Sequence, residues 1–344
     1  MTSADYEIAD DGFDDVEGEI AALQDADAAQ PSVDPVIRRA VPVSVTGDTD
    51  ELIAAAIEEC LEHFEANSAT FLKLDHVGAV HQMRVALRRL RAFLKLFNHD
   101  VQVAKFATLR QQAGELASAF GVARELDVFA AMVAQGPALL FHNEEGMRLF
   151  MAACERRRAE GYGAAHEALA APQTHAFIED LRQFQQMRSW REALGEPEQC
   201  AILETPAKTF VRALLDREDR KCRKKAKRFS SLDENEKHEL RIRFKALRYA
   251  TEAFGPLICG RRKLAGYRAA LAQVQDGLGA FNDLVVARKI TEELRPFLST
   301  NGLETKFAKA SGMVLGWCAR AQQETNAASG ELVAQFRNAR RPWD

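Results

Sequence analysis

Apolar positions recur at intervals of three and four residues along most of the chain, which is the period of a helix that buries one face. Beyond residue 50, Ala, Leu, Glu, Lys and Arg dominate and β-branched runs are scarce, so we predict no strand. The pattern predicts an all-α protein with helices over residues 51–66, 76–97, 102–119, 123–135, 144–171, 174–193, 205–229, 234–254, 261–277, 281–296 and 303–338, separated by Gly and Pro.

The first 50 residues differ in composition from the rest of the chain. They contain thirteen acidic residues against Arg38 and Arg39, and they hold few large hydrophobic side chains. Such a segment buries too little apolar surface to offset the entropy lost on ordering, so we expect residues 1–50 to form a disordered acidic tail. Residues 51–344 carry 44 basic and 37 acidic side chains, and they are numerous enough to bury a large core.

One segment concentrates positive charge on a single helix face. Residues 81–97 read HQMRVALRRLRAFLKLF and contain five Lys or Arg residues and no acidic residue. On a helical wheel, one strip of about 80° holds His81, Arg84, Arg88, Arg91 and Lys95. Apolar residues border the strip on both sides, whereas a solvated helix face usually interleaves acidic residues with its cations. The pattern favours a half-exposed binding face over an ordinary solvated one.

The same cationic pattern occurs a second time. Residues 238–254 read HELRIRFKALRYATEAF and align without a gap at an offset of 157 residues. The alignment pairs His81 with His238, Arg84 with Arg241, Arg88 with Lys245, Arg91 with Arg248, and Phe97 with Phe254, while Lys95 is replaced by Glu252. Downstream, AFGVARELDVF at 119–129 resembles LGAFNDLVVA at 278–287, which places Glu125 opposite Asp283. We therefore expect two similar helical halves, residues 51–171 and 205–341, joined by a connecting segment, residues 172–204.

These paired motifs resemble the CHAD domain, the conserved histidine α-helical domain. The resemblance rests on the two His-x-x-Arg-x-x-x-Arg/Lys-x-x-Arg helices, the Gly and acidic-Leu element after each, and a closing helix with Gly316-Trp317, and it covers about residues 51–341. It implies two four-helix bundles related by pseudo-two-fold symmetry around a basic central channel. The function that it implies is non-catalytic binding of inorganic polyphosphate.

The resemblance also implies which side chains touch the ligand. The family's basic ligands correspond here to Arg84, Arg88, Arg91, Arg241, Lys245 and Arg248, with His81 and His238 alongside. To these we add Arg89 and Lys95 from the first segment. Two features depart from the family pattern: Glu125 stands where the family usually has Asp, and the acidic tail lies outside the match.

A third basic element precedes the second strip. Residues 217–228 read REDRKCRKKAKR, and a strip of about 80° on the wheel holds Arg217, Arg220, Lys221, Lys224 and Arg228. Cations at i, i+3, i+7 and i+10 of a helix stand about 4.5 to 6 Å apart along its axis, which suits a linear chain of phosphates. Arginine adds a planar, permanently charged fork that binds phosphate oxygens bidentately. The alternative for this element is a solvated helix that binds any anion.

The two histidines have more than one interpretation. Neither His81 nor His238 has a second metal ligand four residues on, so zinc is not expected and we predict no metal or cofactor. Each either donates to phosphate when protonated or bonds a neighbouring helix and orients the strip. We expect Glu125 and Asp283 to cap a helix or to pair with nearby Arg rather than to act as catalytic acids.

Three other functions are alternatives to polyphosphate binding. Basic helices also attract nucleic acid, although the strips hold few aromatic residues for base stacking. A scaffold for acidic proteins is a further alternative. A phosphohydrolase would need a carboxylate cluster for Mg²⁺ or a phosphate-binding glycine loop, and the sequence has neither motif, so we expect no enzyme. The tail is also a candidate polyanion mimic that occupies the channel.

Composition bears on the compartment as well. Six cysteines lie at wide and irregular spacing without a Cys-x-x-Cys motif, which is typical of reduced thiols. The chain shows neither a basic-apolar leader nor an apolar run of about 18 residues. We expect a cytoplasmic protein without membrane partners, and polyphosphate granules are one candidate location.

Overall fold

The computed structural model describes residues 37–194, 200–297 and 304–344, and one compact unit spans Ile37–Asp344. The first 36 residues of the expected acidic tail lie outside the described residues. The described part is all-helical and contains no strand, which confirms the predicted class.

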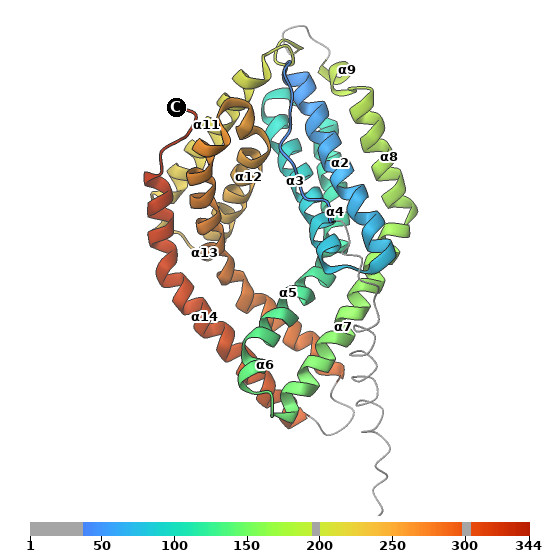
Figure 1. Cartoon of the computed structure of the whole chain (residues 1–344), viewed down its shortest axis with the longest axis vertical. Coiled ribbons are helices and arrows are strands. Elements are labelled where there is room, and N and C mark those ends of the chain that lie inside the picture. The colour runs from blue at the N-terminus through green and yellow to red at the C-terminus, as the bar shows by residue number, and fades with distance from the viewer. Residues whose placement is uncertain (1–36, 195–199, 298–303) are drawn as a thin grey trace, which may run out of the picture. The chain divides into compact units, whose positions relative to one another are not determined.

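Twelve named α-helices make up most of the described chain (Figure 1). They are α2 (Thr49–Leu74), α3 (Val77–Val101), α4 (Ala104–Ala119), α5 (Gly121–Gln135), α6 (Pro137–Leu140), α7 (Glu145–Ala170), α8 (Pro172–Gln186), α9 (Trp190–Leu194), α11 (Ala207–Ala226), α12 (Glu234–Ile258), α13 (Arg261–Leu294) and α14 (Glu304–Asn338). Local sequence explains several ends. Asp48 caps α2, and a reciprocal capping box of Asp233 and Glu236 begins α12.

The buried side chains form two clusters. The larger contains residues of α2, α3, α4, α8, α11 and α12, the beginning of α5 and of α13, and the ends of α7 and α14. At its centre α3 meets α12, where the ring centroids of Phe93 and Phe254 lie 4.7 Å apart. The smaller joins α5 and α7 to the remaining parts of α13 and α14 through Phe129, Phe150 and Phe307. Because α5, α7, α13 and α14 contribute residues to both clusters, they connect the two cores.

The prediction of a helix break between residues 277 and 281 is wrong, because α13 runs without interruption from Arg261 to Leu294. Gly277, the last residue of the expected helix 261–277, lies inside α13 and contacts α14. A Cβ at this position would lie 2.6 Å from Cδ1 of Leu332, and the Ser329 hydroxyl donates to the Gly277 carbonyl over 2.9 Å. The glycine therefore allows α14 to approach α13 closely.

The expected helix 174–193 is divided into α8 and α9. Arg188, between them, adopts the left-handed region with φ 49°, which ends regular helix at that point. The turn directs the Arg188 guanidinium to the carboxylate of Asp50 at the start of α2. A tertiary ion pair thus accompanies a helix break that the local sequence does not predict.

The end of the expected tail is ordered, in contrast to the prediction for residues 37–50. Arg38 forms an ion pair of 2.7 Å with Glu59 of α2, and Val43 is buried in the larger core. The Val43 amide also donates to the carbonyl of Ala253 in α12 over 2.9 Å. This segment packs across helices of both predicted halves, and such long-range contacts compensate for its unfavourable local composition.

Asp50 is a buried carboxylate with several partners from α9 and the turn before it. Its side chain is 1% exposed, and it accepts hydrogen bonds from Trp190 Nε1 at 2.7 Å and from Arg191 Nε at 3.0 Å, besides the Arg188 pair. Burial raises the pKa of Asp50, but the hydrogen bonds from Arg191 and Trp190 and the two arginine charges outweigh burial and hold that pKa below its ordinary value.

We predict that Asp50→Asn lowers the free energy of unfolding by about 2 to 3 kcal/mol, because the buried Trp190 N–H and two guanidinium groups lose a charged acceptor. Since the folded-state pKa is lowered, the stabilisation is present above the ordinary carboxyl pKa and is lost as the pH falls through the folded value. Urea denaturation of both proteins at several pH values measures this. Glu58→Gln, at an exposed position of α2, is the control, and equal stability of all three proteins would contradict the assignment.

Candidate anion-binding site

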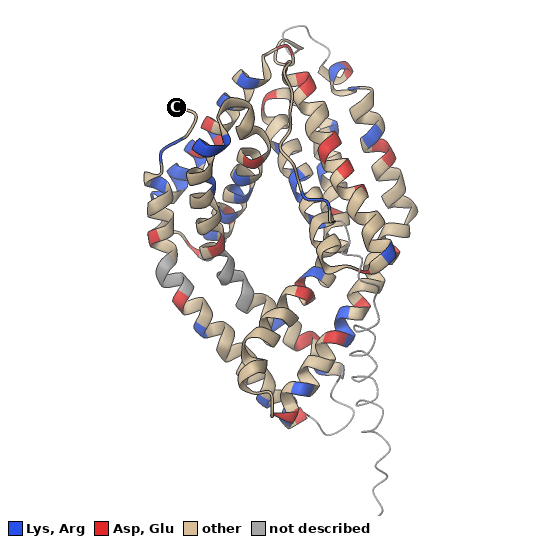
Figure 2. Cartoon of the chain, in the orientation of Figure 1, with Lys and Arg blue, Asp and Glu red and all other residues tan. Residues whose placement is uncertain are grey.

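The two repeated cationic segments lie on α3 and α12, which contact each other (Figures 1 and 2). A cavity of about 640 Å³ lies where these two helices meet α4 and α11. Its lining contains seven cationic residues, namely Arg88, Arg91, Lys95, Arg110, Lys221, Arg243 and Lys245, and one carboxylate, Glu218. Two segments that are 157 residues apart in sequence therefore direct cations into one shared space.

Lys245, which lines the cavity, is half-buried and surrounded by other cations. Burial lowers its pKa to about 8, and the charges of Arg241, Arg88 and Arg84 lower it further in that order. These arginines come from both α3 and α12, so charges of both cationic strips lower the pKa of this one lysine. The positive charges repel one another at a half-buried site, which is the environment that an anion would relieve.

Arg84 lies deeper along the α3 strip than Arg88. Its Nη1 donates to the carbonyl oxygen of Ala117 on α4, and burial followed by the charge of Arg88 lowers its pKa to about 10. Arg88 Nε in turn donates to the Arg84 carbonyl over 3.3 Å. Backbone acceptors therefore orient both guanidinium groups without neutralising their charge.

The histidines that define the repeat occupy different environments. Burial, followed by the charges of Arg124, Arg88 and Arg84, lowers the pKa of His81 to about 4, so its ring is neutral near pH 7. A neutral ring does not donate to phosphate as a cation, and His81 Nδ1 is buried without a hydrogen-bond partner in the described part of the chain, so the hydrogen bond to a neighbouring helix stays a prediction. His238 is exposed on α12 and is not among the residues that line the cavity.

Arg84 and Arg241 are not among the residues that line the cavity, although their charges act on Lys245. Three further predicted site residues make structural contacts instead of lining it. Arg89 is 3% exposed, donates to the Val41 carbonyl over 3.1 Å and lies over the ring of Phe93 at 5.5 Å. Arg248 pairs with Glu252 at 2.7 Å, and Arg217 pairs with Asp100 at 2.8 Å. Because Arg217 lies on α11 and Asp100 on α3, the latter pair joins two walls of the cavity.

The cations of α11 separate into different environments. Lys221 lines the cavity and pairs with Glu218 at 2.9 Å. Arg220 and Lys224 line a second pocket against the end of α14, and Arg228 is exposed outside the lining of both. The third basic element therefore contributes one of its five singled-out cations to the shared cavity.

Sequence reasoning missed several cations that the structure brings to the site. Arg243 lies on α12 outside the aligned strip, and Arg110 projects from α4, which carries no repeated motif. The charge of Arg124 on α5 lowers the pKa of His81. Arg243 falls inside a segment that was already singled out, whereas Arg110 and Arg124 are isolated arginines that only tertiary packing brings near.

The downstream motif of each repeat carries one acidic residue, Glu125 in the first and Asp283 in the second. Glu125 forms an ion pair of 3.4 Å with Lys289, and its negative charge raises the pKa of Arg84. The side chain of Asp283 lies outside the described residues. In the described part of the chain, no group of three or more His, Cys, Asp or Glu residues could hold a metal ion. None of the described helices is long and apolar enough to cross a membrane.

Fold and site together define an all-helical protein with a cationic cavity assembled from two repeated helices. The family model of the CHAD domain matches residues 55–292, and the chain belongs to this family. The crystal structure of the CHAD domain from the plant Ricinus communis is similar with a TM-score of 0.72 and 27% identity, over 90% of this chain and 99% of that one. PptA from Streptomyces chartreusis shares the fold with a TM-score of 0.57 and 15% identity, over 85% of this chain and 100% of that one. A comparison with curated proteins gave no match.

Proposed function

We propose that the chain binds inorganic polyphosphate, without catalysis, in the cationic cavity between α3 and α12. The observation that carries this proposal is that Arg88 of α3 and Lys245 of α12, from the two repeats, line one cavity. Burial, followed by the charges of Arg241, Arg88 and Arg84, lowers the Lys245 pKa to about 8. Cations from two helices are held close together with a single carboxylate in the cavity lining. A polyanion replaces this repulsion by charge-assisted hydrogen bonds, each worth roughly 1.5 to 3 kcal/mol.

The internal repeat supports a pseudo-two-fold arrangement of two four-helix bundles around a basic channel, which we include in the proposal. Phe97 and Phe254 are equivalent positions of the two repeats, and their ring centroids lie 5.7 Å apart. Contact between equivalent residues is what a two-fold relation produces on its axis. We place the halves at residues 51–171 and 205–341, with 172–204 connecting them.

The composition of the cavity lining supports polyphosphate over nucleic acid as the ligand. Tyr249 and His99 supply the two rings among the residues that line the cavity, whereas single-stranded nucleic acid is usually bound on several aromatic rings. Arginine forks and lysine ammonium groups recognise phosphate oxygens without reading bases. A ligand that consists of phosphates alone satisfies this lining best.

Competition between the two ligand classes tests the proposal. We expect long-chain polyphosphate to bind the purified protein with a steep dependence on salt, because each phosphate contact releases counterions. Single-stranded RNA at equal phosphate concentration should displace it poorly at moderate salt. Efficient displacement by RNA, or phosphate release above background with Mg²⁺, would contradict the proposed function.

A further inference from the structure

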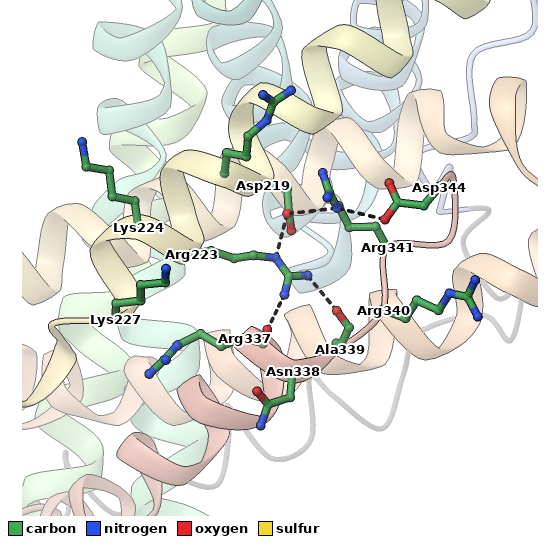
Figure 3. Close-up of a pocket in the computed structure, with 11 residues that line it drawn as sticks. Asp219, Arg223, Lys224, Lys227, Arg337, Asn338, Ala339, Arg340, Arg341 and Asp344 are labelled. Carbon is green, nitrogen blue, oxygen red and sulfur yellow. Dashed lines mark hydrogen bonds and ion pairs between the residues drawn. The ribbon is translucent and has the colours of Figure 1, made fainter.

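A second basic pocket lies between α11 and the C-terminal end of α14 (Figure 3). It has a volume of about 420 Å³, and its lining includes seven Lys or Arg residues and two Asp residues. None of its lining residues belongs to the lining of the cavity between α3 and α12. This pocket therefore has its own lining and shares only the helix α11 with the first site.

Two of the seven cations hold the pocket together. Arg223 forms an ion pair of 2.7 Å with Asp219 and donates to the carbonyl oxygen of Ala339 over 2.8 Å, as Figure 3 shows. Arg341 pairs with Asp344 at 3.2 Å and with Asp216 of α11 at 3.0 Å. These contacts fasten the residues after α14 to α11, and they engage both carboxylates of the lining.

Three of the other cations have no carboxylate partner among the described residues. Lys224, Lys227 and Arg337 are exposed, and none of them forms an ion pair with any residue that the structure describes. Figure 3 shows these three side chains gathered on one side of the pocket, with Arg340 on the opposite side of Ala339. Three charges without carboxylate partners around a pocket open to solvent form a binding surface for phosphate oxygens.

The second pocket adjoins the cavity along α11. Lys221 lines the cavity, and Lys224, three residues further on, lines the pocket. Residues three apart on a helix have Cβ atoms about 5–6 Å apart, so only one helix ridge separates the two surfaces. Arg220 and Lys224 belong to the same wheel strip as Lys221, which makes the cationic surface continuous across α11.

We propose that the pocket between α11 and α14 is an outer subsite that binds the part of a long polyphosphate chain that extends beyond the cavity. This inference rests on the proposed function of the cavity. A short polyphosphate fills the cavity alone, whereas a longer chain crosses α11 and also contacts Lys224, Lys227 and Arg337. The outer subsite thus makes affinity depend on chain length.

The test compares tripolyphosphate with long-chain polyphosphate on a triple variant, Lys224→Ala, Lys227→Ala and Arg337→Ala. We expect affinity for the long chain to fall about tenfold at low salt and its salt dependence to lose about two units of slope, since three phosphate contacts disappear. Affinity for tripolyphosphate should stay unchanged, which also shows that the variant is folded. The matched control is Lys73→Ala, Arg148→Ala and Lys208→Ala, which removes three exposed cations outside both linings.

The outcomes separate the two proposals. Equal loss for both chain lengths, equal loss in the control triple, or no loss for the long chain would overturn the outer subsite while the cavity proposal stands. Loss of RNA binding with unchanged long-chain polyphosphate binding would assign the pocket to nucleic acid and also overturn the inference. Failure of the unmodified protein to bind either polyphosphate would remove the proposed function and the outer subsite together.

Discussion

Replacing Arg88 and Lys245 together by glutamate is expected to weaken polyphosphate binding by at least about a hundredfold, because two charge-assisted contacts of roughly 1.5 to 3 kcal/mol each become repulsive. These residues come from opposite repeats, and both line the shared cavity. Titration at several salt concentrations measures the effect. The salt dependence should become shallower as well, since fewer counterions are released.

Stability and net charge are the controls for this double reversal. Lys73→Glu with Lys208→Glu changes the charge by the same amount at exposed positions outside the cavity lining, and we expect it to bind almost normally. Without ligand, the Arg88→Glu and Lys245→Glu protein should melt at the same or a higher temperature, because repulsion with Arg84 and Arg241 is relieved. Equal weakening by both double variants would show that net charge, not the cavity, governs binding.

The affinity for polyphosphate is expected to fall about tenfold between pH 7 and pH 9.5, because Lys245 loses its proton with a pKa of about 8 in the free protein. A bound phosphate favours the charged ammonium and raises this pKa, so binding takes up a proton above pH 8. Isothermal titration in buffers of different ionisation enthalpy measures the proton uptake directly.

Lys245→Arg is the decisive variant for this pH dependence. It places in α12 the residue that the first repeat has at the equivalent position, Arg88, and arginine stays protonated throughout the range. We expect this variant to bind polyphosphate with little change between pH 7 and pH 9.5. Lys221→Arg, which makes the same substitution in the same cavity, should leave the pH dependence intact. A pH dependence that survives Lys245→Arg would assign it to another group.

The same shift predicts a change in the stability of the unliganded protein. The folded-state pKa of Lys245, about 8, is lower than its ordinary value of 10.5, so the unfolded chain binds more protons between these two values. The contribution of Lys245 to the free energy of unfolding therefore becomes more favourable as the pH rises through this window. Lys245→Met should remove that contribution in pH-dependent denaturation.

Much of the fold follows from local patterns. The apolar period predicts helices, and α3, α4, α5 and α7 lie within a few residues of their expected ranges. The wrong predictions fall where residues that locally favour a helix end or disorder make contacts with distant parts of the chain. The expected helix 261–277 ends at Gly277, but this glycine lies inside α13 and allows α14 to pack closely against it. Residues 37–50 resemble a disordered tail, but contacts of Arg38 and Val43 hold them in place.

By itself, the sequence determined the helical class, the two cationic repeats and the family to which they belong, because periodicity, charge and motif spacing are properties of neighbouring residues. Tertiary structure decided which cations share a space. It buried Arg89, paired Arg217 and Arg248 with carboxylates, and brought Arg110 and Arg243 to the cavity. Whether a charge is neutralised or left to bind an anion depends on partners that are distant in sequence, and only packing places those partners.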